Sequence, residues 1–336
     1  MAFVPQLVFV EKKALEYRLG QDLLNKFRRN NIPIQIYERR LPSVDPDWTP
    51  RERFLHFKRT LVVGIWRQRE FQTCKPSAHY QLPLISGCPG LCQYCYLATN
   101  LADRPYVKVY ANTEDIFDRA REYVKVRSPE VTIFEASATS DPVAVEEWTG
   151  SLRKAIKFFA QLPNARLRFV TKFADVETLL GLDHQEKTEV RFSINAPWAV
   201  QRFEQGVSPV RMRLEAAARV QAEGYPIGIL IAPIFLYPNW QQQYDLLIKE
   251  VAQVLPDAPL TFELITHRFT ARAKAVIKDV FPQSELPLSE EERQLKYGQF
   301  GYRKFVYPRQ QTKELELFFR DRITTLMPQA QILYFV

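Results

Sequence analysis

The chain has 336 residues, of which 46% are hydrophobic, so it can bury a large core and is not expected to be disordered. Its formal charge of +8 is compatible with binding a phosphate backbone, although many proteins that bind no nucleic acid are as basic. Four cysteines are too few for a disulfide-stapled secreted protein, and the longest apolar run, residues 227–237, is too short to span a bilayer. Charged residues interrupt the N-terminal apolar stretch by Glu11, so no signal peptide is predicted, and we expect a cytoplasmic protein without a membrane partner.

The pattern of apolar residues, caps and prolines divides the chain into three regions. Residues 1–57 are predicted to be an N-terminal extension with some helix near 14–29. In residues 58–282, helical and extended segments alternate, and residues 283–336 are predicted to hold a hairpin and a helix. The predicted strands are 60–66, 131–134, 167–171, 190–194, 227–235 and 260–265. The predicted helices of the last two regions are 113–126, 144–162, 176–180, 208–224, 239–254, 271–280 and 311–326.

Strands that alternate with helices imply parallel βαβ units, and about six such units fit between residues 60 and 282. This number favours an open, partial barrel over a closed barrel of eight units. We therefore predict an α/β fold, a partial (β/α)6 barrel with an N-terminal extension and a C-terminal β-hairpin region. In such folds the chemistry lies at the carboxyl ends of the strands, in the loops that lead to the helices.

Three of the four cysteines, Cys88, Cys92 and Cys95, lie in one loop with the spacing C-x3-C-x2-C. Three thiolates in a tight loop can bind three irons of a 4Fe-4S cubane and leave the fourth iron open to a small molecule. A structural zinc site, as in a non-catalytic zinc-binding nucleic-acid module, is the alternative, but such a site normally has four protein ligands. Cys74 or His79 could supply the fourth, although neither has the usual paired spacing.

Tyr94, directly before Cys95, completes the pattern C-x3-C-x-aromatic-C, and with it the loop resembles the cluster loop of the radical S-adenosylmethionine superfamily. The resemblance implies that the open iron binds the amino and carboxylate groups of S-adenosylmethionine. It further implies that an electron from the cluster cleaves this cofactor to a 5′-deoxyadenosyl radical.

Seven further segments resemble spore photoproduct lyase, and they run from about residue 60 to the end of the chain. They are KPSAHYQLPLISGC, PYVKVYANTEDIF, FEASATSDP, RLRFVTKF, RFSINAPW, FELITHRFT and GYRKFVYP. That family reverses 5-thyminyl-5,6-dihydrothymine, the spore photoproduct, in ultraviolet-damaged DNA. The adenosyl radical removes a hydrogen atom from C6, the methylene bridge breaks, and the remaining thymine radical must collect a hydrogen atom. The resemblance thus implies a monomeric DNA-repair lyase of the cytoplasm or spore core, supplied by an unidentified electron donor.

The sequence departs from the family at the last step, because Ala138 stands where the family has a hydrogen-donating cysteine. Cys74 is the one cysteine outside the cluster loop, and its S–H bond is weaker than the C–H bond to be formed. We hypothesise that Cys74 is the donor, and that Tyr96, which matches a tyrosine of the family, relays the radical. The alternatives are that Cys74 is a small buried hydrophobic residue, or that the chain is a relative acting on RNA or a small molecule.

The resemblance also assigns binding residues at the strand ends. Ser140, Lys172 and Ser193, with Asn195 on the same strand end, are expected to contact S-adenosylmethionine, although helix capping or solvation would also explain them. Segment 295–307 is predicted to be a hairpin whose aromatic and basic side chains suit base stacking and phosphate attraction, and a packed edge hairpin is the alternative. A core histidine is the alternative for position 267. The expected substrate contacts are Tyr94, His267, Arg268, Tyr297, Phe300, Tyr302 and Lys304.

Overall fold

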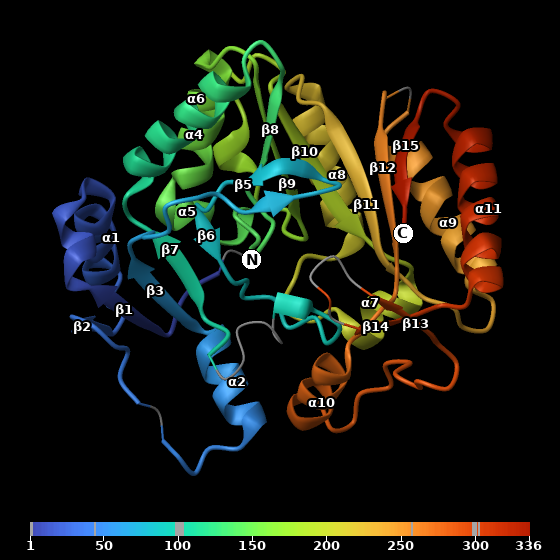
Figure 1. The fold of residues 1–336 in the computed structure, drawn as a ribbon, viewed down its shortest axis with the longest axis horizontal. Helices are drawn as coiled ribbons and strands as arrows, with labels where there is room; N and C mark the ends of the chain where they lie inside the picture. Colours follow the sequence, from blue (N-terminus) through green and yellow to red (C-terminus); the bar gives the residue numbers. More distant parts are fainter. Residues whose placement is uncertain (1–2, 44, 98–103, 257, 298–300, 302) are drawn as a thin grey trace.

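The computed structural model describes residues 3–43, 45–97, 104–256, 258–297, 301 and 303–336. In this part of the chain an eight-stranded sheet has the order β15-β12-β11-β10-β9-β8-β5-β4, and a five-stranded sheet has the order β2-β1-β3-β7-β6. The large sheet curls into a half barrel, with helices on its outer side (Figure 1). All neighbouring strands of this sheet pair in parallel, except that β4 and β5 pair with each other antiparallel. The predicted partial barrel is confirmed.

The large sheet consists of β4 (Thr73–Cys74), β5 (Ala78–Gln81), β8 (Thr132–Glu135), β9 (Ala165–Thr171), β10 (Thr188–Ile194), β11 (Ile227–Ile234), β12 (Thr261–Thr266) and β15 (Gln331–Phe335). The smaller sheet consists of β1 (Leu7–Glu11), β2 (Ile34–Tyr37), β3 (Thr60–Gly64), β6 (Ile85–Ser86) and β7 (Val107–Tyr110). The described α-helices are α1 (Arg18–Arg29), α2 (Pro50–Lys58), α4 (Thr113–Arg127), α5 (Glu146–Thr149), α6 (Ser151–Gln161), α7 (Pro197–Phe203), α8 (Val210–Ala222), α9 (Trp240–Val254), α10 (Ala271–Val280) and α11 (Arg309–Leu326). Short 3-10 helices cover Lys12–Glu16, Val143–Val145 and Glu177–Leu179.

Alternation along the barrel strands separates an apolar outer face from a charged inner face. In β9, Leu167 and Phe169 belong to the main hydrophobic core under the helices, and Arg168 lies between them. Because successive side chains of a strand point to opposite faces, Arg168 points into the half barrel. Phe192 of β10 likewise packs in the core, and its neighbour Arg191 points inward. The fold therefore buries charge inside the half barrel.

Most elements of the barrel agree with the predictions from the sequence. The predicted strands correspond to β3, β8, β9, β10, β11 and β12, although β3 joins the smaller sheet. The predicted helix 144–162 is divided, because Gly150 adopts a positive φ of 60° between α5 and α6. The predicted division at residues 57 and 282 stays a prediction. Pairing crosses both boundaries, since β1 pairs with β3 and β12 pairs with β15.

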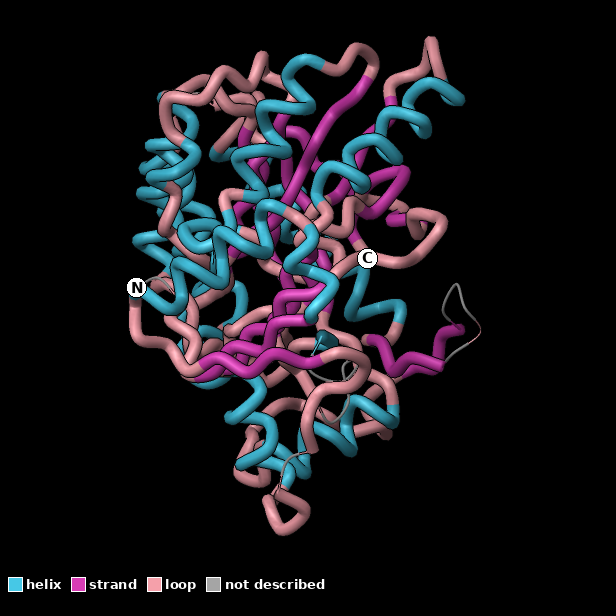
Figure 2. Tube along the Cα trace, turned by 90° about the vertical axis from the view of Figure 1, so that its left-hand side faces the viewer, coloured by secondary structure: helices cyan, strands magenta, loops and turns pink. Residues whose placement is uncertain are grey.

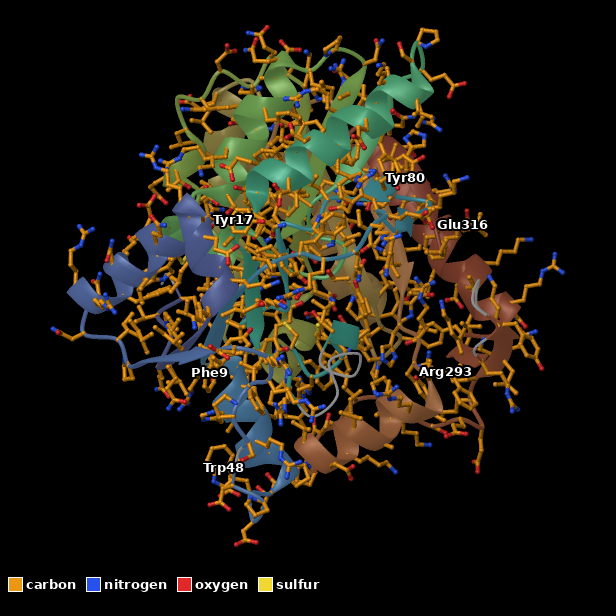
Figure 3. All side chains as sticks on the ribbon, turned by 60° about the vertical axis from the view of Figure 1, so that its left-hand side comes forward. Phe9, Tyr17, Trp48, Tyr80, Arg293 and Glu316 are labelled. Atoms are coloured by element: carbon orange, nitrogen blue, oxygen red, sulfur yellow. The ribbon has the colours of Figure 1, made fainter. Side chains whose placement is uncertain are left out.

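A second hydrophobic cluster lies where α2 packs against α10, and these two helices lie side by side at the bottom of Figures 1 and 3. Helix α2 begins with a capping box in which Thr49 and Glu52 satisfy each other's backbone N–H groups, and Pro50 occupies the first turn. Phe54 of α2 meets Phe281 edge-on at a centroid distance of 5.3 Å. This contact joins the N-terminal region to the end of α10. No helix of the described chain is long and apolar enough to cross a membrane.

Candidate active site

The cysteine loop is attached to the carboxyl end of β8 at its first residue. Gly87 forms a bridge with Ser140, and its N–H donates to the carbonyl oxygen of Thr139 at 2.8 Å. Gly87 has a φ of 80°, and a Cβ atom there would lie 2.2 Å from the carbonyl oxygen of Tyr106. Only glycine fits both requirements. The loop is thereby fixed above the barrel mouth, beside the residues of the β8 loop.

Within the loop, the backbone is arranged as a cradle for thiolates. The N–H of Gly90 points to the sulfur of Cys88 at 3.3 Å, and a Cβ at this glycine would lie 2.8 Å from Val207. The buried ammonium group of Lys58 donates to the carbonyl oxygen of Cys88 at 2.7 Å. Hydrogen bonds and positive charge around ligating sulfurs are features of iron–sulfur sites. The residues present therefore fit an iron–sulfur cluster.

The described residues do not form a site for a single metal ion. No three His, Cys, Asp or Glu side chains among them lie close enough together to hold one ion, as a mononuclear zinc site requires. A cubane makes a different demand, because each thiolate binds a different iron and the sulfurs stand further apart. A loop with three thiolates offers the number of protein ligands that a cubane with one open iron requires.

A buried ionic network contacts the cysteine loop through Tyr94. The ammonium group of Lys172 donates to the hydroxyl oxygen of Tyr94 at 2.9 Å and to Glu204 at 2.6 Å, and Tyr94 also donates to Glu204. Arg213 holds the other oxygen of this carboxylate at 2.7 Å. Burial alone would raise the pKa of Glu204, but the charges of Lys172 and Arg213 lower it to about 2. Lys172 is therefore held at the mouth, between the cysteine loop and the end of β9.

The loop after β8 brings three of the predicted residues together. Asp141 accepts hydrogen bonds from the Thr171 hydroxyl and from the Lys172 N–H, each at 2.8 Å, and so ties this loop to the end of β9. Ser140 is buried beside it, with its hydroxyl 3.2 Å from the carbonyl oxygen of Ala136. On the other side, the hydroxyl of Tyr96 donates to the carbonyl oxygen of Ala138. Tyr96, Ser140 and Lys172 thus surround one end of the barrel.

The residues predicted at the next two strand ends are more deeply buried. Ser193 is buried, and its carbonyl oxygen accepts from Arg213 at 2.8 Å. Asn195 is 0% exposed, and its amide donates to the carbonyl oxygen of Pro233 and accepts from the hydroxyl of Tyr244. This arrangement favours a structural role for Asn195, whose cofactor contact stays a prediction.

The strand end after β12 presents one buried and one exposed residue. His267 is 2% exposed, packs against Phe235 and accepts a hydrogen bond from Arg293. Burial, with the nearby Arg293 charge, lowers the pKa of His267 well below its usual value, so the ring is neutral. These contacts favour the core-histidine alternative. Arg268 is exposed at the barrel mouth, and its substrate contact stays a prediction.

The predicted hairpin is present as β13 (Gln294–Tyr297) paired with β14 (Arg303–Val306) (Figure 2). Its base is fixed, because Phe305 stacks on Phe269 at 5.2 Å and the two exchange backbone hydrogen bonds. Tyr297 is 72% exposed near the tip, and Lys304 lies on the paired strand. Phe300 and Tyr302 lie outside the described residues.

Cys74 lies on the edge strand β4, near the charged inner face of the barrel. The carboxylates of Glu135 and Glu263 and the guanidinium groups of Arg191 and Arg168 lie close enough to influence its thiol. Burial, reinforced by Glu135, raises the pKa of Cys74 to about 12. The group therefore stays a protonated thiol at neutral pH, which is the form that can give up a hydrogen atom.

We predict that Cys74 reacts slowly with iodoacetamide up to pH 9, because the thiolate is the nucleophile. Since the pKa of the folded protein is about 12, the rate should keep rising beyond pH 9 without levelling off. Peptide mass spectrometry of alkylated protein measures this rate, and the chain unfolded in denaturant is the control. A plateau with a midpoint near the ordinary cysteine pKa of about 8.5 would contradict the burial of the thiol.

Comparison with known proteins agrees with these features over the whole chain. A family model described as spore photoproduct lyase matches residues 3–336. The spore photoproduct lyase of Clostridium acetobutylicum is 44% identical over 329 residues, which cover 98% of each chain. The enzyme of Bacillus subtilis is 42% identical over 343 residues, covering 99% of this chain and 98% of the relative. This chain belongs to the spore photoproduct lyase family.

Solved structures of spore photoproduct lyase superpose on the chain over its full length. The structure complexed with dinucleoside spore photoproduct superposes with a TM-score of 0.97 at 42% identity. The match covers 100% of both chains. Another, with the same TM-score at 43% identity and the same coverage, contains bound AdoMet and dinucleoside spore photoproduct. It is a mutant in which one cysteine is replaced by alanine and one serine by cysteine. The chain is thus a radical S-adenosylmethionine lyase by family.

Several residues of this family member were not found from the sequence. Glu204 follows α7 in a segment without a recognisable motif, and no signal marks it. Arg213 could have been noticed, because it shares a helical face with the buried residues Ala217 and Val220. A cation on the apolar face of a helix requires a buried partner, which here is Glu204.

Proposed function

We propose that the chain reverses spore photoproduct in DNA to two thymines, by radical chemistry and without removing nucleotides. The observation that carries the proposal is the identity of 44% to a spore photoproduct lyase over 98% of both chains. The position of the cysteine loop at the carboxyl ends of the barrel strands supports it.

We propose that Cys88, Cys92 and Cys95 hold a 4Fe-4S cluster and that S-adenosylmethionine binds beside it. Together these groups would supply a 5′-deoxyadenosyl radical at the barrel mouth. Lys172 offers an ammonium group for a carboxylate, and Ser140 and Ser193 offer hydroxyls. Tyr94 and Glu204 keep Lys172 extended toward the cysteine loop.

In the proposed final step, Cys74 gives a hydrogen atom to the thymine radical. The S–H bond breaks, the C–H bond forms, and the unpaired electron moves to the sulfur. The Tyr96 hydroxyl then gives a hydrogen atom to the sulfur, which restores the thiol and leaves the electron on Tyr96. In the solved mutant, the exchanged cysteine and serine positions are as far apart in sequence as Ala138 and Cys74. The same spacing in that engineered relative supports the proposal that Ala138 and Cys74 are the equivalent positions of this chain.

We propose that the hairpin and the strand-end loop after β12 contact the lesion strand. Tyr297 is exposed for stacking, and the positive charges of Lys304 and Arg268 would attract phosphates. Phe300 and Tyr302 are proposed to act with them. The identity of the electron donor, the monomeric state and a location in the cytoplasm or spore core stay predictions.

The test uses anaerobically reconstituted protein with dithionite, S-adenosylmethionine and dinucleoside spore photoproduct. We expect thymine to form from the lesion, and we expect none when S-adenosylmethionine is omitted. Product is measured by chromatography with mass detection. Cleavage of S-adenosylmethionine without any conversion of the lesion would contradict the proposed substrate and favour a different one.

A further inference from the structure

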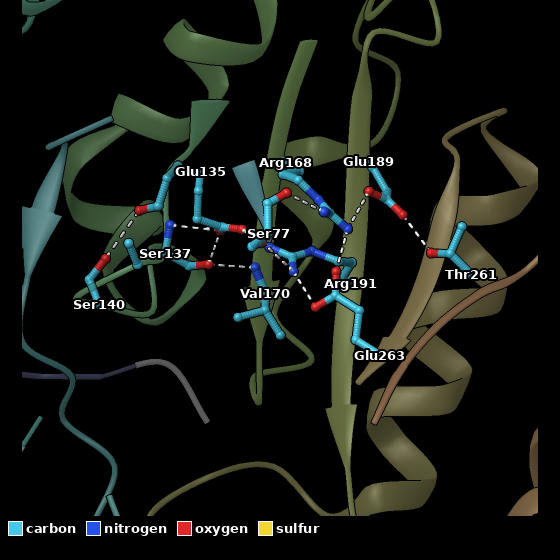
Figure 4. Close-up of polar contacts among 12 residues, drawn as sticks. Ser77, Glu135, Ser137, Ser140, Arg168, Val170, Glu189, Arg191, Thr261 and Glu263 are labelled. Carbon is cyan, nitrogen blue, oxygen red and sulfur yellow. Dashed lines mark hydrogen bonds and ion pairs between the residues drawn. The ribbon is translucent and has the colours of Figure 1, made fainter. Parts of the chain in front are cut away.

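A buried ionic network crosses the inner face of the half barrel (Figure 4). Arg191 of β10 contacts Glu135 of β8 and, at 2.8 Å, Glu263 of β12. Arg168 of β9 contacts Glu263 at 2.6 Å and Glu189 at 2.9 Å. The side chains of both arginines are less than a tenth exposed. The network therefore connects the adjacent strands β8, β9 and β10 with β12, which lies beyond β11 in the sheet.

A buried ionic network of this kind is an inefficient way to stabilise the folded state. Removing charges from water costs several kcal/mol for each ion, and apolar residues of similar volume often stabilise a protein as well or better. Its geometry is nevertheless specific, because each guanidinium group bridges two carboxylates. The specific geometry of the network would be explained if it fixed the position of another segment of this chain.

The network holds Ser77, a residue of the connection between β4 and β5. Its hydroxyl donates to Glu135 at 2.8 Å and accepts from Arg191 at 3.2 Å. Its carbonyl oxygen accepts from Arg168 at 2.6 Å. Three members of the network, on three different strands, therefore converge on this one residue, as Figure 4 shows.

Ser77 lies three residues after Cys74, on the short connection between β4 and β5. Pro76 restricts the backbone between them, and Cys74 pairs with Ala78 directly after Ser77. Because β4 is an edge strand of two residues, few other contacts fix it. The position of the Cys74 thiol therefore depends on the anchor at Ser77.

We propose that Ser77, held by Glu135, Arg168 and Arg191, positions the Cys74 thiol for hydrogen-atom transfer to the product radical. The inference rests on the proposed function, in which Cys74 is the donor. These four residues are positioning residues, because they act through the segment that carries the thiol.

The inference separates two steps of the reaction. In the proposed reaction, the cysteine loop would hold the groups that generate the adenosyl radical, and consumption of the lesion would not require the anchor at Ser77. Transfer from the thiol requires the S–H bond to point at the substrate carbon, and a displacement of about 1 Å can cost about 100-fold in rate. A displaced thiol therefore lowers the share of consumed lesion that becomes thymine, while consumption itself continues.

The experiment compares Ser77→Ala, Ser77→Thr and Thr261→Val. Ser77→Ala removes the anchoring hydroxyl, and Ser77→Thr keeps it. Thr261→Val is the matched control, because it removes a 2.6 Å hydrogen bond to Glu189 at the far end of the same network. Each protein is assayed with dinucleoside spore photoproduct for lesion consumed and thymine formed. Without lesion, the rate of alkylation of Cys74 by iodoacetamide at pH 8 is measured.

For Ser77→Ala we expect the yield of thymine per lesion consumed to fall at least threefold and Cys74 to be alkylated at least threefold faster. Ser77→Thr and Thr261→Val should keep both values within a factor of two of wild type. Unchanged yield and alkylation in Ser77→Ala would overturn the inference, as would equal changes in Thr261→Val. Alkylation is independent of catalysis, so the anchor is tested even if wild-type protein leaves the lesion intact, which would refute the proposed function instead.

Discussion

Replacement of Cys92 by alanine is expected to leave a folded protein without its iron–sulfur cluster and to abolish cleavage of S-adenosylmethionine. The three thiolates are the proposed cluster ligands, and two cysteines cannot hold a cubane with one open iron. Loss even of an outer partner of a metal site costs about 10–100-fold, so we expect activity below about one-hundredth of wild type. Iron and sulfide analysis, with 5′-deoxyadenosine formation under dithionite, measures both effects.

Two further variants make this result interpretable. Cys92 is buried, so its loss could disturb packing, whereas Cys95 is less buried and should give the same loss of iron when replaced. Cys74→Ala is the matched control, because it removes a cysteine outside the loop and should keep iron and cofactor cleavage. Full iron content in both loop variants would refute the proposed ligands.

The sequence predicts the barrel well because its long strands are apolar on the face under the helices. Helix α2 was missed although its capping box is a local signal, whereas most of the missed strands are short or depend on distant partners. Strands β4 and β6 have two residues each, and only pairing with β5 and β7 defines them. Strand β15, at the opposite edge, pairs only with β12, to which no local pattern points. Tertiary pairing, which sequence periodicity does not report, determines these elements.

The candidate site shows the same contrast. The cysteine spacing is local and predicts the loop, and the strand-end rule places Ser140 and Lys172 at the barrel mouth. The charges of the inner face were missed, because a charged residue at alternate positions of a strand looks like a solvated face. The signal was present in RLRF, VRF and FELI, where a charge interrupts strands otherwise expected to be buried on both faces. Depth of burial, as for Asn195, is a tertiary property.

Replacement of Cys74 by alanine is expected to stop thymine formation while the lesion is still consumed. The cofactor reaction does not involve this thiol, whereas the product radical loses its hydrogen source and reacts with other partners. We expect the yield of thymine per lesion consumed to fall to about one-tenth or less, a difference of about 1.4 kcal/mol or more between the competing barriers. Assays in D₂O add a second measurement, since an exchangeable thiol delivers deuterium to wild-type thymine.

Moving the thiol from residue 74 to residue 138 tests whether a cysteine at either position can donate the hydrogen atom. In Cys74→Ala combined with Ala138→Cys, the chain acquires the arrangement that the family resemblance implies for other members. The Ala138 backbone already contacts the hydroxyl of Tyr96, so a thiol at residue 138 lies beside the proposed relay. We expect this double variant to recover at least half of the wild-type thymine yield, again with deuterium from solvent. Wild-type yield in Cys74→Ala alone would show that another group donates the hydrogen atom, and failure of the double variant would show that the substrate presents only one face to a thiol.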